Sequence, residues 1–203
     1  MRIAIIGKGP FWWSYRPKRT EYNGIWAIND QCLYMGPEDC TKMFDMHNFE
    51  WELEDCIKHY TTMMNGASES EIFNAATLKY GLFETKTKLI NRREMPLISV
   101  KAYDFIPTSI GYPREQIIEE VCYGDDFLTC TVSYAIAYAI FIGVAAVDLY
   151  GISAMDDYQS QHPSIAYLLG IAQERGIRVG INRDGGSDLL QSKFHYGYLE
   201  TYP

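Results

Sequence analysis

One stretch without charged side chains, residues 127–147, limits what this chain can fold into more than any other feature of its sequence. Its length of about 20 residues is enough to cross a lipid bilayer. Gly143 interrupts the stretch, however. Membrane spans typically have a cluster of Lys or Arg beside them, and none flanks this stretch. We therefore interpret it as a buried helix that ends at Gly143, followed by a buried strand at residues 145–150. No contact with a membrane is predicted.

Alanines alternate with larger apolar residues through residues 135–140, so the predicted helix has no polar face. A helix that is apolar all round has to be covered by protein on every side. This helix and the strand after it are therefore predicted to form the centre of the fold.

Five further short apolar segments are predicted to be strands, at residues 2–6, 24–28, 42–46, 96–100 and 177–181. Apolar spacing and helix-end residues predict helices at 50–60, 68–80, 113–121 and 163–175. Residues 85–93 are polar and are predicted to form a loop or lid. Because strands that alternate with helices indicate parallel crossovers, the predicted fold class is α/β: a Rossmann-like, open, mainly parallel sheet with helices on both faces, in one domain over residues 1–203.

The composition excludes several classes of protein. A formal net charge of -8 argues against extended contacts with nucleic acid, whose affinity rests on Lys and Arg. The five cysteines are odd in number and lack C-x-x-C spacing, so neither a zinc site nor a disulfide framework is indicated. Too few apolar residues follow Met1 for a secretory signal, and a cytoplasmic location is predicted. Whether the chain forms a homo-oligomer stays open.

Ligands of open parallel sheets bind outside the carboxyl ends of the strands, so residues just after each strand are the site candidates. The first strand ends in Gly7, Lys8, Gly9 and Pro10, where glycines let backbone N–H groups approach a phosphate. The pattern is neither the dinucleotide fingerprint nor a P-loop. Basic and aromatic residues follow within residues 11–19, as a nucleotide would require. The alternative is a plain turn with a solvated basic loop.

The next two predicted strands also end in polar residues. Asn29 and Asp30 follow the second strand and are predicted to contact a ribose or a metal-held phosphate, or to form a simple turn. Asp45 and His47 follow the third strand and, being two apart in an extended segment, point to the same side. They are candidates for a catalytic acid/base pair, with a polar structural role as the alternative.

The loop after the central strand contains further candidates. Asp156 and Asp157 would hold Mg²⁺ on a phosphate, and His162 would act as a general base. A hydrophilic loop that only caps the next helix is the alternative. The ends of the central helix and strand are also placed to contact a nucleotide, through Thr131, Gly151 and Ser153.

The order of these motifs resembles a known group of folds. The opening G-x-G-P turn, Ile28-Asn29-Asp30, Phe44-Asp45-Met46-His47 and residues 129–153 are similar to small Rossmann-like proteins, many of them encoded by bacteriophages and of unknown function. That group shares its layout with the family 42 sialyltransferases and the hydroxymethylpterin pyrophosphokinase-like proteins. The resemblance covers most of the chain and implies a fold, whereas function belongs to sites.

In the sialyltransferases, the opening turn and an Asn after the second strand hold a cytidine nucleotide sugar. Gly7, Gly9, Pro10 and Asn29 match that pattern, but Lys8 replaces an Asn, which argues against a sialic-acid donor. The resemblance leaves a nucleotide or nucleotide-sugar ligand as its implication, and the first hypothesis is a nucleotide-dependent transferase, foremost a glycosyltransferase with a nucleotide-sugar donor. The alternatives are a Mg²⁺-dependent phosphotransferase and a non-catalytic phage protein that binds a small signalling nucleotide.

Overall fold

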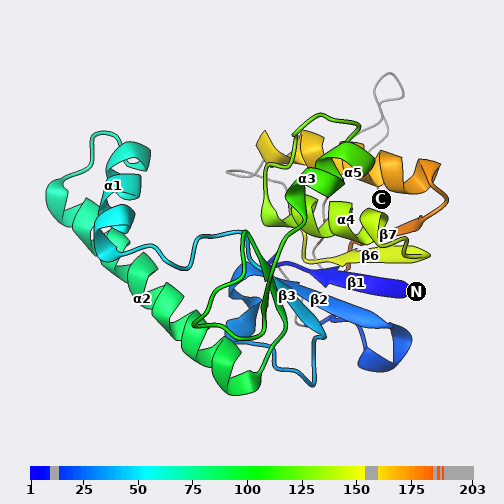
Figure 1. Cartoon of the computed structure of the whole chain (residues 1–203), viewed down its shortest axis with the longest axis horizontal. Helices are drawn as coiled ribbons and strands as arrows, with labels where there is room; N and C mark the ends of the chain where they lie inside the picture. The colour runs from blue at the N-terminus through cyan, green and yellow to red at the C-terminus, as the bar shows by residue number, and fades with distance from the viewer. Residues whose placement is uncertain (10–13, 154–159, 185–186, 188, 190–203) are drawn as a thin grey trace.

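All seven strands of the computed structural model form one parallel sheet in the order β5-β4-β3-β2-β1-β6-β7 (Figure 1). The structure describes residues 1–9, 14–153, 160–184, 187 and 189. The predicted α/β class is therefore confirmed. The strands are β1 (Arg2–Ile6), β2 (Gly24–Ile28), β3 (Lys42–Phe44), β4 (Leu97–Ser99), β5 (Ser109–Gly111), β6 (Ala146–Tyr150) and β7 (Arg178–Asn182).

The strand order places β1 in the interior of the sheet, between β2 and β6. The chain builds outward from β1 to β5 and then returns to add β6 on the free side of β1. Successive side chains of a strand point to opposite faces. Ile3 and Ile5 accordingly belong to one buried core, and Ala4 and Ile6 to the other. The sheet is thus covered on both faces.

Helices of different parts of the chain cover the two faces. The core that contains Ile3 is closed by α3 (Arg114–Glu120), α4 (Thr131–Phe141) and α5 (His162–Glu174). The core that contains Ala4 is closed by α1 (Leu53–Met63), α2 (Glu69–Arg93) and the 3-10 helix η2 (Asn29–Leu33). A shorter 3-10 helix, η1 (Arg19–Glu21), precedes β2.

The uncharged stretch forms the predicted helix and strand at the centre of this fold. Seven of the eleven residues of α4 are buried, and β6 is buried along its whole length. Gly143 has a φ of 65° and lies between them, in the left-handed conformation that ends a helix. Among the described residues, no helix is both long and apolar enough to span a membrane.

The prediction of a loop or lid at residues 85–93 was wrong, because these residues continue α2 to Arg93. Ala76, Phe83, Lys86 and Ile90 form the buried stripe of this helix. Lys86 occupies a core position, where carboxylates neutralise its charge. A lysine at a buried position makes the segment look too polar to form a helix with a buried face. The edge strand β5 was also missed, since it has only three residues and none of them is buried.

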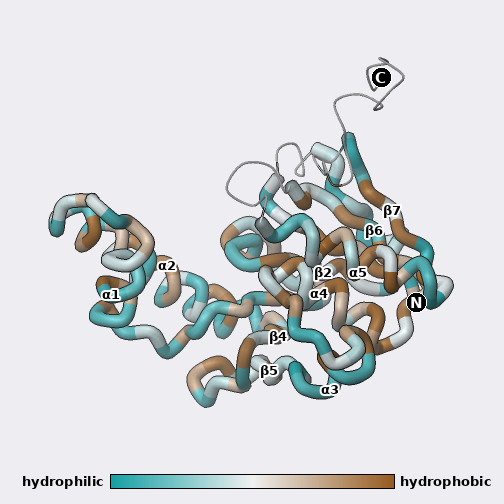
Figure 2. The backbone as a smooth tube through the Cα atoms, turned by 90° about the horizontal axis from the view of Figure 1, so that it is seen from above, coloured by the Kyte–Doolittle hydropathy of each residue, from teal (hydrophilic) through white to brown (hydrophobic). Residues whose placement is uncertain are grey.

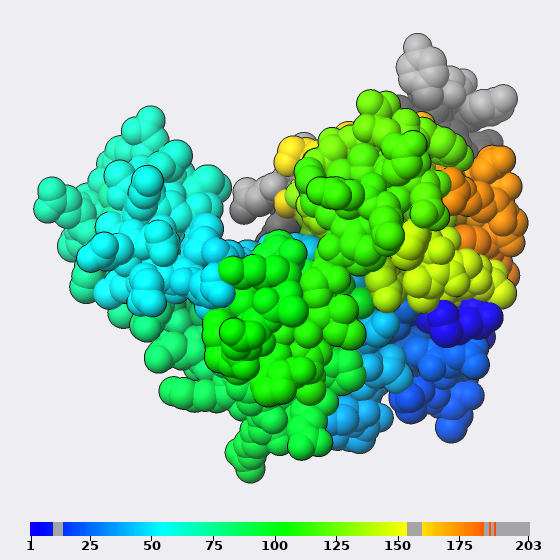
Figure 3. Space-filling view, in the orientation of Figure 1, coloured from blue at the N-terminus to red at the C-terminus, as the bar shows by residue number. Residues whose placement is uncertain are grey.

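The pair α1 and α2 extends away from the rest of the molecule. Figure 1 shows α1 and the first half of α2 standing beside the sheet, and Figure 3 shows a hollow between this arm and the body. In Figure 2, the arm alternates between hydrophilic and hydrophobic residues along both helices. The second half of α2 packs under the sheet, so one helix joins the arm to the core.

Candidate functional site

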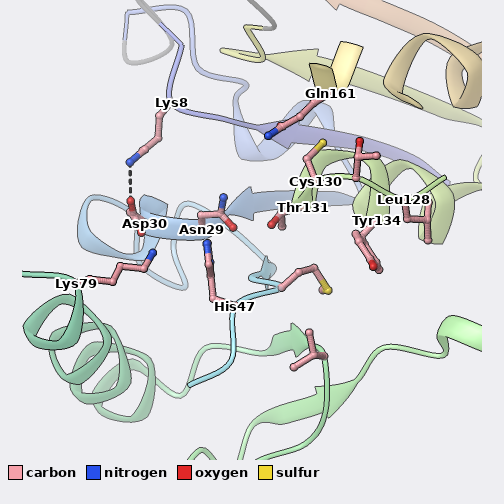
Figure 4. Close-up of a pocket in the computed structure, with 13 residues that line it drawn as sticks. Lys8, Asn29, Asp30, His47, Lys79, Leu128, Cys130, Thr131, Tyr134 and Gln161 are labelled. Carbon is pink, nitrogen blue, oxygen red and sulfur yellow. Dashed lines mark hydrogen bonds and ion pairs between the residues drawn. The ribbon is translucent and has the colours of Figure 1, made fainter. Parts of the chain in front are cut away.

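A pocket of about 470 Å³ opens at the carboxyl ends of the central strands (Figure 4). Residues directly after β1, β2, β3 and β4 line it, together with Lys79 of α2, the start of α4 and Gln161, which precedes α5. This is the edge of a parallel sheet where ligands bind. The pocket therefore brings together segments that are far apart in the sequence.

Asp45 and His47 meet directly after β3. The Nδ1 atom of His47 lies 2.5 Å from Oδ1 of Asp45, which also accepts the backbone N–H of His47 at 3.1 Å. Asp45 is 1% exposed, whereas the His47 side chain is 39% exposed and lines the pocket. A carboxylate that accepts from Nδ1 fixes the imidazole ring and leaves Nε2 as the basic nitrogen. The imidazole ring is therefore held by a buried carboxylate, with its other nitrogen on the pocket side.

The loop that carries His47 is held by side chains of the neighbouring strand and its loop. The Ser99 hydroxyl donates to the carbonyl oxygen of Asp45 at 2.6 Å. The Tyr103 hydroxyl donates to the carbonyl oxygen of His47 at 3.3 Å and accepts the N–H of Phe49 at 3.1 Å. Phe83 of α2 lies against the imidazole, with the ring centroids 6.0 Å apart. The position of the imidazole is therefore fixed from several sides.

Lys86 is the buried cation behind this pair. Its side chain is fully buried, forms an ion pair with Asp45 and lies 3.2 Å from Oδ1 of Asp30. Burial alone would raise the pKa of Asp45, but the contacts with His47 and Lys86 outweigh burial and hold this pKa at about 2. Burial lowers the pKa of Lys86, and the two carboxylates more than reverse the effect. Both groups therefore stay charged inside the protein.

Asp30 links the buried pair of Lys86 and Asp45 to Lys8 at the mouth of the pocket, so that positive and negative groups alternate. Its Oδ2 atom accepts from the Lys8 ammonium group at 2.6 Å (Figure 4), and its Oδ1 atom lies 3.2 Å from the Lys86 ammonium group. Burial raises the pKa of Asp30, but the two ammonium groups outweigh it and lower this pKa below its ordinary value. The series runs from Lys8 at the rim through Asp30 to the buried Lys86 and Asp45, and it returns to the pocket surface at His47.

The glycine turn after β1 is tied to the end of β6. The N–H groups of Gly7 and Gly9 donate to the carbonyl oxygens of Tyr150 and Gly151 at 2.8 and 2.6 Å. Both N–H groups are therefore already bonded within the protein. The part of this turn that reaches the pocket is the side chain of Lys8. A Cβ atom on Gly7 would lie 2.5 Å from the oxygen of Gly151, so only glycine allows this close approach.

Asn29 occupies an unusual position between β2 and the pocket. Its φ is 52°, a left-handed conformation that side chains seldom adopt outside turns and functional sites. Its Oδ1 atom is buried and has no hydrogen-bond partner among the described residues. Asn29 also lines the pocket, so a rotation of its side-chain amide would bring this buried acceptor to a ligand.

The start of α4 forms the opposite wall. Thr129, Cys130 and Thr131 line the pocket, with Cys130 as the residue that precedes the helix. The N–H groups of a first helical turn have no acceptor within the helix, and together with the helix dipole they attract anions. Leu128 and Tyr134 add apolar surface at this end, and the ring of Tyr134 rests edge-on against Tyr112 at 4.9 Å.

The remaining candidates from the sequence lie at or beyond the pocket's edge. His162 begins α5, but the side chain that lines the pocket is that of the preceding Gln161. Gly151 contributes its carbonyl to the turn after β1, and Ser153 lies outside the pocket lining. The predicted site residues Pro10, Asp156 and Asp157 lie outside the described residues.

No group of three or more metal-binding side chains occurs among the described residues. Asp30 in the pocket lining and the buried Asp45 behind it are both bound by lysines. Sequence reasoning missed Lys79 and Lys86 because they fall in α2, away from any strand end. A lysine on the otherwise apolar stripe of Phe83 and Ile90 was the one signal in the sequence that could have revealed Lys86.

Comparisons with known proteins add no relative: no family model matches the chain, and no curated protein or solved structure matches it. The resemblance to phage Rossmann-like proteins and to sialyltransferases therefore stays a prediction from the motifs.

Proposed function

We propose that this protein is a nucleotide-dependent transferase that moves a glycosyl group from a nucleotide-sugar donor to an acceptor hydroxyl, with His47 as the general base. The observation that carries the proposal is the 2.5 Å contact between His47 Nδ1 and the buried carboxylate of Asp45, at the wall of a pocket. A general base needs this combination of an oriented ring and an accessible second nitrogen.

The proposed reaction follows from which nitrogen carries the proton. With Nδ1–H donating to Asp45, the lone pair on Nε2 takes the proton of the acceptor hydroxyl. The acceptor oxygen forms a bond to the anomeric carbon as the bond from that carbon to the phosphate oxygen breaks. The nucleotide leaves with the bonding electrons, and the buried Asp45 stabilises the imidazolium that forms.

The two ends of the pocket suit the two parts of a nucleotide donor. Tyr134 and Leu128 offer apolar contact for a base or sugar ring. The first turn of α4 favours the phosphates, and Thr131 supplies a hydroxyl beside it. The unpartnered Oδ1 of Asn29 would accept a hydrogen bond from a ribose hydroxyl or a base amine once the side-chain amide rotates toward the ligand.

The test begins with the molecule that binds. Mass spectrometry of any small molecule that co-purifies, followed by calorimetric titration with nucleotides and nucleotide sugars, identifies the donor. Replacing Lys8 with Gln or Asn29 with Ala should weaken nucleotide binding and leave the fold intact. Unchanged nucleotide affinity in both variants would remove these residues from the donor site.

Catalysis is tested separately by the variant His47→Gln. It should slow donor turnover by about 10²- to 10⁴-fold while the nucleotide Kd stays unchanged. The exposed Lys88 of α2 provides the control Lys88→Gln. Turnover equal to that of the wild type would contradict the role of His47. Activity that disappears in excess chelator would favour the phosphotransferase, and tight binding without turnover would favour a nucleotide-binding protein.

A further inference from the structure

Lys79 is the one cation of the pocket that no carboxylate neutralises within the described part of the chain. It lies on α2, two turns before Lys86, and lines the pocket opposite the start of α4. Lys8 and Lys86 both form ion pairs, whereas Lys79 forms none with any described residue. Its ammonium group lies 4.9 Å from the ring centroid of Phe83.

The position of Lys79 is costly for the protein without a ligand. Burial lowers the pKa of Lys79, and the nearby ammonium group of Lys86 lowers it further. The carboxylates of Asp30 and Asp45, which form no ion pair with Lys79, offset this only in part. Both ammonium groups lie near the ring of Phe83, since Lys86 is 5.6 Å from its centroid. A half-buried ammonium group without a counter-ion is stabilised when an anion binds beside it.

The charge of the pocket has the opposite sign to that of the whole chain. Of the residues that line the pocket, Lys8 pairs with Asp30 and Lys79 adds one positive charge when His47 is neutral, while Lys86 and Asp45 behind the lining neutralise each other. The whole chain carries a formal charge of -8. A local cationic pocket on an acidic protein selects small anions over large polyanions such as nucleic acids.

The arrangement separates two places for negative charge. Figure 4 shows Lys79 and His47 reaching toward the same part of the pocket, with Thr131, Cys130 and Tyr134 on the other side. The start of α4 is the place for the donor phosphates in the proposed function. Lys79 is then left for a second anion, with the imidazole of His47 between the two.

We propose that the acceptor substrate is itself a small anion, a phosphorylated sugar or similar phosphorylated alcohol, held by Lys79 so that its free hydroxyl faces His47. The role of this anion as an acceptor rests on the proposed transferase function. The existence of an anion site depends on Lys79 alone. A lysine ammonium group binds phosphate as a compact point charge with three donors.

The test uses glucose 6-phosphate and glucose as a matched charged and neutral pair, titrated calorimetrically with no donor present. Glucose 6-phosphate should bind about ten- to a hundredfold more tightly than glucose, as one charged hydrogen bond in a partly buried site provides. The variant Lys79→Gln should abolish this preference, and Lys79→Arg should keep it. The control Lys88→Gln and the variant His47→Gln should also keep it.

Equal binding of the two sugars, or a preference that survives in Lys79→Gln, would overturn the proposal. Circular dichroism and thermal melting establish that each variant is folded. Turnover of a nucleotide sugar without dependence on Lys79 would contradict the anionic acceptor and leave the transferase standing. Lys79-dependent phosphate binding without any nucleotide binding would contradict the transferase and leave the anion site standing.

Discussion

The ammonium group of Lys86 and the carboxylate of Asp45 form an ion pair in which both side chains are almost completely buried. The pair joins the middle of α2 to the end of β3, and it lies directly behind the imidazole of His47. Breaking such a pair leaves an uncompensated charge in the protein interior, which is far more costly than losing an exposed pair.

The variant Lys86→Met should therefore lower the free energy of unfolding by about 3–5 kcal/mol. Urea denaturation measures this loss, and Lys88→Met on the exposed face of α2 should change it by less than about 0.5 kcal/mol. The double variant of Lys86→Met with Asp45→Asn should cost less than the sum of the single changes. Equal losses at positions 86 and 88 would show that the ion pair is not important for stability.

Asp45 should make the protein sensitive to acid. Its pKa is about 2 in the folded protein and 3.8 ordinarily, so its contribution to stability is complete above pH 4 and is lost as the pH falls toward 2. The contribution is about 2 kcal/mol. Denaturation between pH 5 and pH 2 should show this loss in the wild type, and a smaller pH slope in Asp45→Asn. Identical slopes would argue against a depressed pKa.

Two glycines should respond in opposite ways to replacement by Ala. The new methyl group of Gly7→Ala would meet the Gly151 oxygen at 2.5 Å and Ile152 Cδ1 at 2.7 Å, and should destabilise the protein by about 1–3 kcal/mol. Gly81 lies within α2, with nothing within 4 Å of the added carbon. Gly81→Ala should stabilise the protein by about 0.5–1 kcal/mol. Thermal melting of both variants decides the comparison.

Cys130 should be the first thiol to react with a reagent such as iodoacetamide. It lines the pocket and is partly exposed, whereas the other four cysteines are buried. Burial raises the pKa of Cys32 to about 11 and that of Cys40 to about 12, which disfavours their thiolates. Mass spectrometry of labelled peptides measures the order of reaction.

The Cys130 reaction also reports on the ligand. A nucleotide bound at the start of α4 should slow the labelling of Cys130, and the variant Cys130→Ser should lose the fast phase altogether. Labelling at the same rate with and without a saturating nucleotide would place the ligand away from this wall.

Much of the fold followed from local patterns in the sequence. The first two strands were predicted with the bounds that the structure has, because both are short apolar runs closed by turn residues. The central helix and β6 were predicted because an uncharged run must be buried. What failed was α2 beyond Tyr80, where polar residues on the exposed face and Lys86 on the buried face hid the helical spacing.

The candidate site was predictable only in part. The pairing of Asp45 with His47 depends on spacing within one strand end, so the sequence could suggest it. The contacts of Lys86 with Asp30 join residues 56 positions apart, and no local pattern reveals them. The bonding of Gly7 and Gly9 to the end of β6 likewise depends on strand order.

The position of β1 between β2 and β6 also has a consequence during synthesis on the ribosome. Ile3 pairs with Gly24 on one side and with Val147 on the other, so its second neighbour emerges long after the first. Until then, one edge of β1 is unpaired and the face that α4 will cover is exposed to water. A nascent chain in this state offers an open strand edge and apolar surface, both of which favour aggregation. We therefore expect recovery of soluble protein to depend on chaperones that cover this edge and surface until β6 has been synthesised.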